Sequence, residues 1–401
     1  MAGERIWAPM RSSDYRRLWF GQAVSVVGDK IDQIALGVLV YELTGSGLQV
    51  GIMLAISMLP TAVFGMVAGA YVDRWDRRRT MIAADLLRAG LVVAVPFAAE
   101  VGLWLVYVIA LAVAAGSLFF EPAKLSLMPE LVGSDQLMAA NSLDSATVSV
   151  AELLGLAFAG GLVASIGYRV AFFADGITYL LSAVFVAAIA YREQGGRSKG
   201  IGWGEALAAA GEGLRYVRSH DMLRDLLVVY AVAAAGVSAA ITFVYVLALD
   251  RFAAGARGLA GLDAAITIGL LVGSVAVGRF AMRGASRRLL IGLTAFAAIF
   301  ATSAFAPTIL WTAGIFAAAG VANMFVYVPA AAIVQTESAP EMRGRALAAK
   351  NVLARALSVL GYIGAGLLTE RIGISPAILV VAAAIALAAL LGWSRPRLRA
   401  G

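Results

Sequence analysis

Long apolar runs, separated by short polar clusters, occupy almost the whole chain. A helix needs about 20 mostly apolar residues to cross a bilayer, because the hydrocarbon core is about 30 Å thick. Hydrophobic residues make up 61% of the 401 residues and charged residues only 14%. Ordinary soluble domains are about a quarter charged, since their surfaces face water. The chain is therefore predicted to be an integral membrane protein.

Twelve of these runs are predicted to be membrane-spanning helices, and Gly, Pro and polar turn signals separate them. The predicted spans are residues 18–42, 48–72, 79–99, 102–120, 138–165, 169–191, 223–248, 259–281, 287–306, 309–333, 345–368 and 374–393. The predicted fold class is an all-α membrane protein.

The basic residues are distributed unevenly among the loops. If the N-terminus is cytoplasmic, 25 of the 32 Lys and Arg residues fall in cytoplasmic segments and 4 in external loops. Cytoplasmic loops of membrane proteins are enriched in Lys and Arg, so both termini are expected in the cytoplasm. Membrane topology also explains the net charge of +7, and no nucleic-acid partner is expected.

Several kinds of chemistry are excluded by composition. The chain has no Cys, which excludes disulfides and thiolate metal sites, and its one His lies in a polar stretch. The Gly-rich run 195–200 lacks the spacing of a phosphate-binding loop, and no strand is predicted before it. We therefore expect no cofactor, no metal, no ATP site and no enzymatic activity. Any energy that the protein uses is expected to come from an ion or substrate gradient, or from a partner.

A weak internal repeat relates the two halves of the chain. A shift of 209 residues aligns Gly69 with Gly278 and Arg74 with Arg283, each in a basic loop after a predicted span. Repeated bundles are common in secondary transporters. The repeat predicts two pseudo-symmetric six-helix bundles, at residues 1–191 and 223–401, joined by a cytoplasmic linker, 192–222. Residues 203–218 of the linker are predicted to form an amphipathic surface helix.

The first of these loops resembles the signature loop of the major facilitator superfamily. The residues that match this signature are Gly69, Asp73, Arg74, Arg77 and Arg78. The resemblance extends over nearly the whole chain and is greatest to the bacterial branch that includes macrolide-efflux and enterobactin-export proteins. It implies a secondary active transporter that works by alternating access.

The resemblance also implies that this loop is a gate element. Asp73 would face the positive N-terminal end of the helix predicted at 345–368, and Arg74 and Arg77 would pair with Glu121. Such contacts would close the cytoplasmic side in one state and break in the other. The alternative for the arginines is a purely topological role as cytoplasmic positive charges.

The chain departs from the family pattern at three places, two of which bear on proton antiport. The second Gly of the signature is Asp76, the Gly-Pro of the antiporter motif is Gly155-Leu156, and the span 102–120 contains no Arg. The last two departures leave the twelve-helix fold unaffected but weaken the specific implication of proton antiport.

Polar residues form one stripe on the first span. At about 100° per residue, five side chains fall within one wedge of that helix: Gln22, Ser25, Asp29, Asp32 and Gln33. Charges at membrane depth usually face a cavity or a partner. Asp29 is the first candidate for a proton or cationic-substrate site and Asp32 the second. Lys30 points about 100° away, toward an acid on a neighbouring helix. The alternative is a static ion-pair network that fixes helix packing.

Two further spans carry polar stripes. Asn141 and Glu152 lie on one face of span 138–165, and Glu152 is a candidate for coupling or for a structural hydrogen bond. Asn351 and Arg355 lie on one face of span 345–368. Arg355 would bind an anionic substrate, hold a carboxylate, or extend its guanidinium to the cytoplasmic interface.

Together these features predict a proton-coupled exporter of a small amphipathic organic compound, such as a drug, siderophore or metabolite. It is expected to act as a monomer in the bacterial cytoplasmic membrane, with the lipid bilayer, the substrate and protons as its partners. One alternative is an inward symporter or facilitator. A second is a non-transporting membrane scaffold or receptor, against which the buried polar stripes argue.

Overall fold

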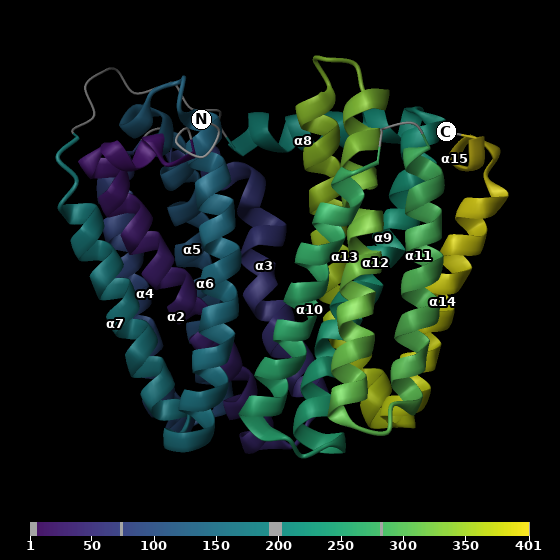
Figure 1. Ribbon diagram of the computed structural model, residues 1–401, viewed down its shortest axis with the longest axis horizontal. Helices are drawn as coiled ribbons and strands as arrows, with labels where there is room; N and C mark the ends of the chain where they lie inside the picture. Colours follow the sequence, from purple (N-terminus) through teal and green to yellow (C-terminus); the bar gives the residue numbers. More distant parts are fainter. Residues whose placement is uncertain (1–5, 73–74, 192–202, 281–283, 401) are drawn as a thin grey trace. The chain divides into compact units, whose positions relative to one another are not determined.

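The computed structural model describes residues 6–72, 75–191, 203–280 and 284–400, and every regular element in these ranges is a helix (Figure 1). Twelve of the described helices are long: α2 (Ser13–Thr44), α3 (Gly47–Val72), α4 (Arg77–Val101), α5 (Leu103–Val132), α6 (Leu137–Ile166), α7 (Tyr168–Ala187), α9 (Asp221–Val246), α10 (Gly255–Gly278), α11 (Ala285–Thr302), α12 (Ile309–Glu337), α13 (Arg343–Ile372) and α14 (Ile374–Ser394). The shorter elements are η1 (Ala8–Arg11), α8 (Trp203–Ser219), the π-helix η2 (Leu247–Arg251), η3 (Ser303–Phe305) and α15 (Pro396–Ala400).

Each of the twelve predicted spans coincides with one long helix. Within the described residues, 11 helices have the length and hydropathy needed to cross a membrane. The twelfth, α2, has 32 residues but carries Asp29, Lys30 and Asp32 near its middle, and these charges lower its hydropathy. The predicted class, an all-α membrane protein with twelve long helices, is confirmed.

Contacts divide the chain into two compact units. The first comprises Met1–Leu39 and Phe64–Ala206, and the second comprises Val40–Val63 and Leu207–Gly401. These units differ from the contiguous halves 1–191 and 223–401 because residues 40–63 belong with the second unit.

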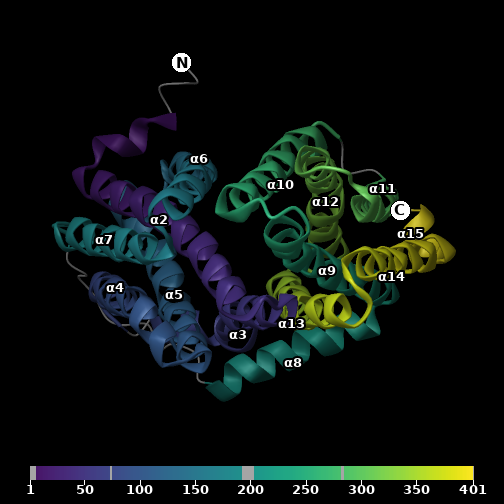
Figure 2. The same ribbon diagram turned by 90° about the horizontal axis from the view of Figure 1, so that it is seen from below.

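In the first unit, α4 packs against α5 and α7, and α2 passes between α6 and α7 (Figure 2). Buried apolar side chains from four helices, including Leu18, Met81, Phe120 and Val186, form one of its core clusters. Because α2 is enclosed on two sides, the polar groups near its middle must find partners inside the protein.

In the second unit, α9 packs against α13 and α14, and α12 packs against α10 and α11. The predicted surface helix is present as α8. Its Tyr216 hydroxyl accepts a hydrogen bond from the Ala339 backbone N–H at 3.0 Å, and its Glu212 pairs with Arg345 at 2.7 Å. The linker helix is thereby attached to the segment between α12 and α13 and to the start of α13.

The internal repeat is visible at the ends of two helices. Both α6 and α13 have 30 residues, and both end at an Ile-Gly pair. Gly167 has a φ of 98° and Gly373 a φ of 80°, a conformation in which a side chain would be strained. The two glycines therefore stop corresponding helices for the same steric reason.

Two lysines assigned to cytoplasmic segments are buried within helices. α5 continues well past the predicted span 102–120, through Pro122, to Val132. Lys124 therefore lies inside this helix and is 3% exposed, while Lys350 lies inside α13 and is 2% exposed. Lys124 thus lies in a helix rather than in a loop after the predicted span 102–120, because the length of α5 follows packing rather than the end of the apolar run.

Candidate functional site

The middle of α2 contacts α7 through a carboxyl–phenol hydrogen bond. The Tyr179 hydroxyl donates to Asp29 Oδ1 at 2.5 Å. The neighbouring Gly28 makes this close approach possible. A Cβ placed on Gly28 would lie 2.0 Å from Thr178 Oγ1 and 2.2 Å from Asp175 Oδ1, far inside van der Waals contact. The glycine therefore sets the separation at which Asp29 meets α7.

On its other side, Tyr179 contacts a buried arginine of α4. Arg88 is 4% exposed, and its guanidinium lies 4.3 Å from the Tyr179 ring centroid and 4.8 Å from that of Phe120. It forms a buried ion pair with Asp85, one turn earlier on α4, and donates to the Ser117 hydroxyl of α5 at 3.3 Å. Ring faces and a carboxylate together offset part of the cost of burying this cation.

Two aspartates of this region are sealed from solvent. Asp85 and Asp175 are both 0% exposed. Asp175 Oδ1 accepts a hydrogen bond from Thr178, on its own helix, at 2.9 Å. Oδ2 of both aspartates is buried without a hydrogen-bond partner among the described residues. Buried polar atoms usually have partners, so these two oxygens require an explanation.

These groups form one polar cluster, which we call the α2–α4–α7 network and define by six residues: Asp29, Asp32, Asp85, Arg88, Asp175 and Tyr179. The carboxyls of Asp29, Asp32 and Asp175 are close enough to influence one another electrostatically. The network holds four carboxyl groups and one guanidinium. Such an excess of carboxyls in a medium of low dielectric constant favours binding of protons or another cation.

A separate ion pair lies where α2 meets α6. Lys30 Nζ lies 3.5 Å from Glu152 Oε1 and also donates to Gln33 Oε1 at 3.1 Å. Gly155 permits this packing, since a Cβ there would lie 2.7 Å from Lys30 Cβ. The antiporter motif lacks its Pro in this chain, but its Gly remains at a close contact between α2 and α6.

The other polar candidates have different environments. Gln22 and Ser25 of α2 are buried, at 6% and 1% exposure, whereas Asn141 and Asn351 are exposed. Arg355 of α13 is half-buried and donates to the backbone carbonyl of Thr61, a residue of the same unit, at 3.3 Å. The polar stripe on α2 therefore faces the interior of the first unit at Gln22 and Ser25.

The predicted gate is described in part. Gly69 lies in α3, and Asp73 and Arg74 lie outside the described residues. Arg77 donates to the Ser126 carbonyl at 3.2 Å and lies 3.9 Å from Glu130.

Glu121 forms an ion pair with the buried Lys124 at 3.2 Å. Arg78 donates to the carbonyls of Val186 and Ala187. These contacts connect the start of α4 to α5 and to the end of α7.

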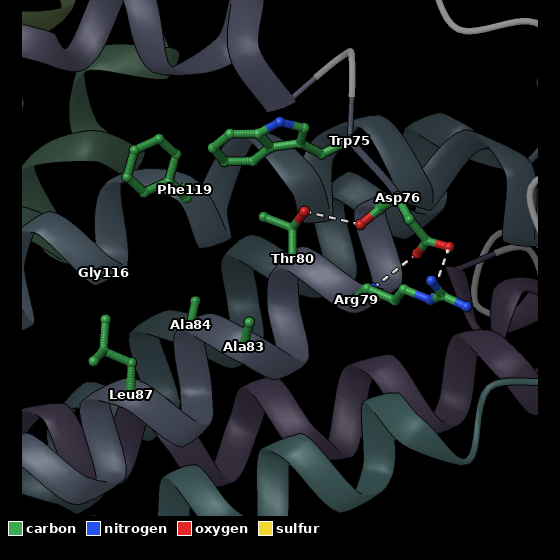
Figure 3. Close-up of a pocket in the computed structure, with 9 residues that line it drawn as sticks. All are labelled: Trp75, Asp76, Arg79, Thr80, Ala83, Ala84, Leu87, Gly116 and Phe119. Carbon is green, nitrogen blue, oxygen red and sulfur yellow. Dashed lines mark hydrogen bonds and ion pairs between the residues drawn. The ribbon is translucent and has the colours of Figure 1, made fainter.

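The substituted position of the signature loop caps a helix. Asp76 Oδ1 accepts from the Arg79 backbone N–H at 2.8 Å, and the Asp76 carbonyl accepts from the Thr80 hydroxyl at 2.8 Å (Figure 3). Asp76 is the N-cap of α4, a position at which Asp is favourable because its side chain accepts from a free backbone N–H of the first turn. The loop borders a cavity of about 490 Å³ on α4 and α5, which is lined mainly by apolar side chains such as Trp75 and Phe119.

The second unit contains a buried cation with aromatic neighbours. Lys350 Nζ lies 4.5 Å from the ring centroid of Tyr230 and 5.2 Å from that of Tyr327. Lys350 was not among the candidates from sequence, because it was counted as one of the cytoplasmic basic residues.

Four members of the network were missed as candidates from sequence: Asp85, Arg88, Asp175 and Tyr179. Two signals were present. Asp85 and Arg88 are opposite charges three residues apart in an otherwise apolar span, a spacing that brings side chains together on a helix. Asp175 is a lone acid within another apolar span, which marks it as costly unless it is functional or paired.

Comparison with known proteins identifies relatives of this chain. The Major Facilitator Superfamily model matches residues 18–359. Macrolide efflux protein A of Streptococcus pyogenes is 25% identical over 375 residues, covering 89% of this chain and 90% of the relative. The multidrug efflux pump Tap of Mycolicibacterium fortuitum is 29% identical over 395 residues, covering 95% of each. The crystal structure of the nucleoside transporter NupG superposes with a TM-score of 0.79 at 13% identity, covering 94% of this chain and 97% of that chain, which shows a shared fold.

Proposed function

Because the chain belongs to the Major Facilitator Superfamily and is thus a secondary transporter rather than an enzyme, we propose that it is a proton-coupled exporter. Its proposed substrate is a small amphipathic organic compound. Transport proceeds by alternating access, in which the substrate site opens to one side of the membrane at a time.

The relatives support the direction of transport. Two proteins with similarity along about nine tenths of the chain or more are named as efflux proteins, one for macrolides and one for several drugs. Both names indicate organic molecules that are much larger than simple ions. An exporter of an amphipathic organic compound is consistent with both.

The observation that carries the proton-coupling proposal is the composition of the α2–α4–α7 network. The network holds four carboxyls and one guanidinium near the middle of three membrane-spanning helices, and of these carboxyls only that of Asp85 is in direct contact with the guanidinium among the described residues. If all four were ionised, the buried negative charge would be poorly compensated. Binding a proton reduces that charge, and releasing it restores the charge, so the free energy of the network depends on its proton occupancy.

The location proposed for the transporter is the bacterial cytoplasmic membrane, with both termini in the cytoplasm. The uneven distribution of Lys and Arg supports this orientation. The proposed functional unit is a monomer that binds substrate and protons and needs no cofactor.

Everted membrane vesicles test the direction and the coupling together. With an acidic interior, an exporter accumulates ethidium, an amphipathic aromatic cation, inside the vesicles. Asp29→Asn, Asp32→Asn and Glu152→Gln variants are compared with the unmodified protein. The coupling assignment fails if all three variants accumulate ethidium as the unmodified protein does. Loss of ethidium from preloaded vesicles under the same gradient would instead indicate inward transport.

A further inference from the structure

The most completely enclosed acid of the network lies on α7 rather than on α2. Asp175 is 0% exposed and near the middle of its helix. Around Asp175, α7 packs tightly against both α2 and α4. Gly28 of α2 abuts the Asp175 carboxyl, and a Cβ on Gly176 would lie 2.5 Å from Val93 of α4. The carboxyl is therefore held between two helices and away from water.

The hydrogen bonds around Asp175 suit neither a permanently charged nor a permanently neutral carboxyl. A permanent carboxylate in the interior would have donors at both oxygens. A permanent carboxylic acid would donate its O–H to an acceptor. Thr178 donates to Oδ1, but Oδ2 has no partner among the described residues. A carboxyl that gains and loses a proton has to be accommodated both as a carboxylate and as a carboxylic acid, so its hydrogen-bond partners fully satisfy neither form.

Ionisable groups on both neighbouring helices lie close to this carboxyl. Asp29 and Asp32 of α2 and Arg88 of α4 all act on it electrostatically. On its own helix, Tyr179 lies between Arg88 and Asp29 and donates its hydroxyl hydrogen to Asp29. Asp29 and Asp32 are less completely enclosed by protein than Asp175, so a proton reaches them before it reaches Asp175.

We propose that Asp175 is a proton-binding site of this transporter and that it receives its proton through the partly buried carboxyls of α2. A proton from the acidic compartment binds first at Asp29 or Asp32, is transferred to Asp175 Oδ2, and later leaves by the reverse transfer. Each transfer converts one carboxylate to a carboxylic acid and one carboxylic acid to a carboxylate, so charge and atoms balance. The role in transport rests on the proposed function, whereas the proton binding itself does not.

The contact with Gly28 gives proton binding a mechanical consequence. The α2 backbone lies directly against the Asp175 carboxyl, with no side chain between them. Adding a hydrogen and removing a charge at this carboxyl changes the packing and electrostatics at the α2–α7 contact. Proton binding at Asp175 therefore shifts the position of the helix that carries Asp29 and Lys30.

Infrared spectroscopy of the full-length protein in phospholipid vesicles tests this site without a substrate. A protonated carboxyl shows a C=O stretching band that a carboxylate lacks, so spectra recorded across a pH titration reveal which carboxyls exchange protons. We expect Asp175→Asn to remove one titrating band. The control, Glu100→Gln, removes an exposed carboxyl that pairs with Arg169 at 2.8 Å and should leave that band unchanged.

Two outcomes would overturn the proposal. One is an Asp175→Asn titration identical to that of the unmodified protein. The other is a band that disappears in Asp175→Asn but does not respond to pH in the unmodified protein, as a permanently neutral structural acid would show. If Asp175→Asn does not fold, Asp175→Glu serves instead. It should retain a titrating band with a displaced midpoint, and an unchanged midpoint would contradict the proposal.

A transport measurement separates failure of this site from failure of the proposed function. In vesicles with an acidic interior, Asp175→Asn is expected to equilibrate ethidium but to lose its gradient-driven accumulation. Accumulation at the level of the unmodified protein would exclude Asp175 as a coupling site. If the unmodified protein shows the titrating band but no gradient-driven accumulation, the proton site stands and the exporter proposal fails.

Discussion

Replacing Gly28 with Ala is expected to destabilise the first unit. The new Cβ would lie 2.0 Å from Thr178 Oγ1 and 2.2 Å from Asp175 Oδ1. Non-bonded heavy atoms are in favourable contact at about 3.5–4.0 Å, so the side chains of Thr178 and Asp175, or the two helices themselves, would have to move by roughly 1 Å or more. Overpacking of this kind typically costs about 1–3 kcal/mol.

The matched control is Gly90→Ala on α4, because a Cβ there meets nothing within 4 Å. Both substitutions gain the same helix propensity, about 0.8–1.0 kcal/mol. The difference in stability between the two variants therefore isolates the steric conflict, and we expect it to be about 1–3 kcal/mol against Gly28→Ala.

Thermal inactivation of the detergent-solubilised protein tests the sign of this difference by comparing the half-lives of the two variants. Unfolding of membrane proteins is often irreversible, so the half-life at a fixed temperature is the appropriate quantity. Gly28→Ala should inactivate faster than Gly90→Ala, and adding Thr178→Ala should restore part of the loss by removing the nearest atom. Equal half-lives for the two Gly variants would refute the close contact between α2 and α7.

Three further predictions concern charges of the first unit. Lys30→Glu and Glu152→Lys are each expected to destabilise the protein, and the double variant, in which the two charges are exchanged, should recover part of that loss. The coupling energy from the double-mutant cycle should be about 0.5–3 kcal/mol. Additive effects of the two changes would show that the ion pair is not formed. Arg88→Ala should cost about 3–5 kcal/mol because it leaves Asp85 buried without its cation. Arg88→Ala combined with Asp85→Asn should give a higher yield of folded protein than Arg88→Ala alone, and an equal yield would contradict this explanation. Asp76→Ala should lower stability by about 0.5–2 kcal/mol through loss of the α4 cap, whereas Asp76→Gly, which restores the family residue, should lower it by only a few tenths of a kcal/mol. Equal rates of thermal inactivation for the two variants would exclude the capping role of Asp76.

The fold was largely predictable because its signals are local. Runs of apolar residues determine where helices cross a membrane, and all twelve predicted spans coincide with long helices. The departures arise where packing extends a helix beyond its apolar run. Lys124 is the clearest case, since it lies in the extension of α5, where Leu127 and Met128 are buried with it.

The candidate site was predictable only in part. Periodicity along one helix identified Asp29 and placed Lys30 on a different face, directed to an acid on a neighbouring helix. It could not identify Tyr179 as the partner of Asp29, because that contact joins residues 150 positions apart. It also could not show that Asp175 lies against the glycine preceding Asp29, since this depends on how closely two helices approach.

The network suggests how one helix can respond to two kinds of contact. α2 contacts α7 through Gly28 and Asp29 and contacts α6 through Lys30. These contacts involve three consecutive residues of α2. If Asp175 binds protons as we propose, a change in its charge is expected to alter the position of the residue that forms the ion pair on the α6 side.

Proton movement by the purified protein in liposomes is the most direct test of proton coupling. A pH-sensitive dye inside the liposomes reports proton flux when ethidium is added, with no other ion gradient present. We predict that ethidium transport drives protons in the opposite direction in the unmodified protein and that the double variant Asp29→Asn with Asp32→Asn abolishes this flux. Ethidium transport without accompanying proton movement, or an undiminished proton flux in the double variant, would contradict the account.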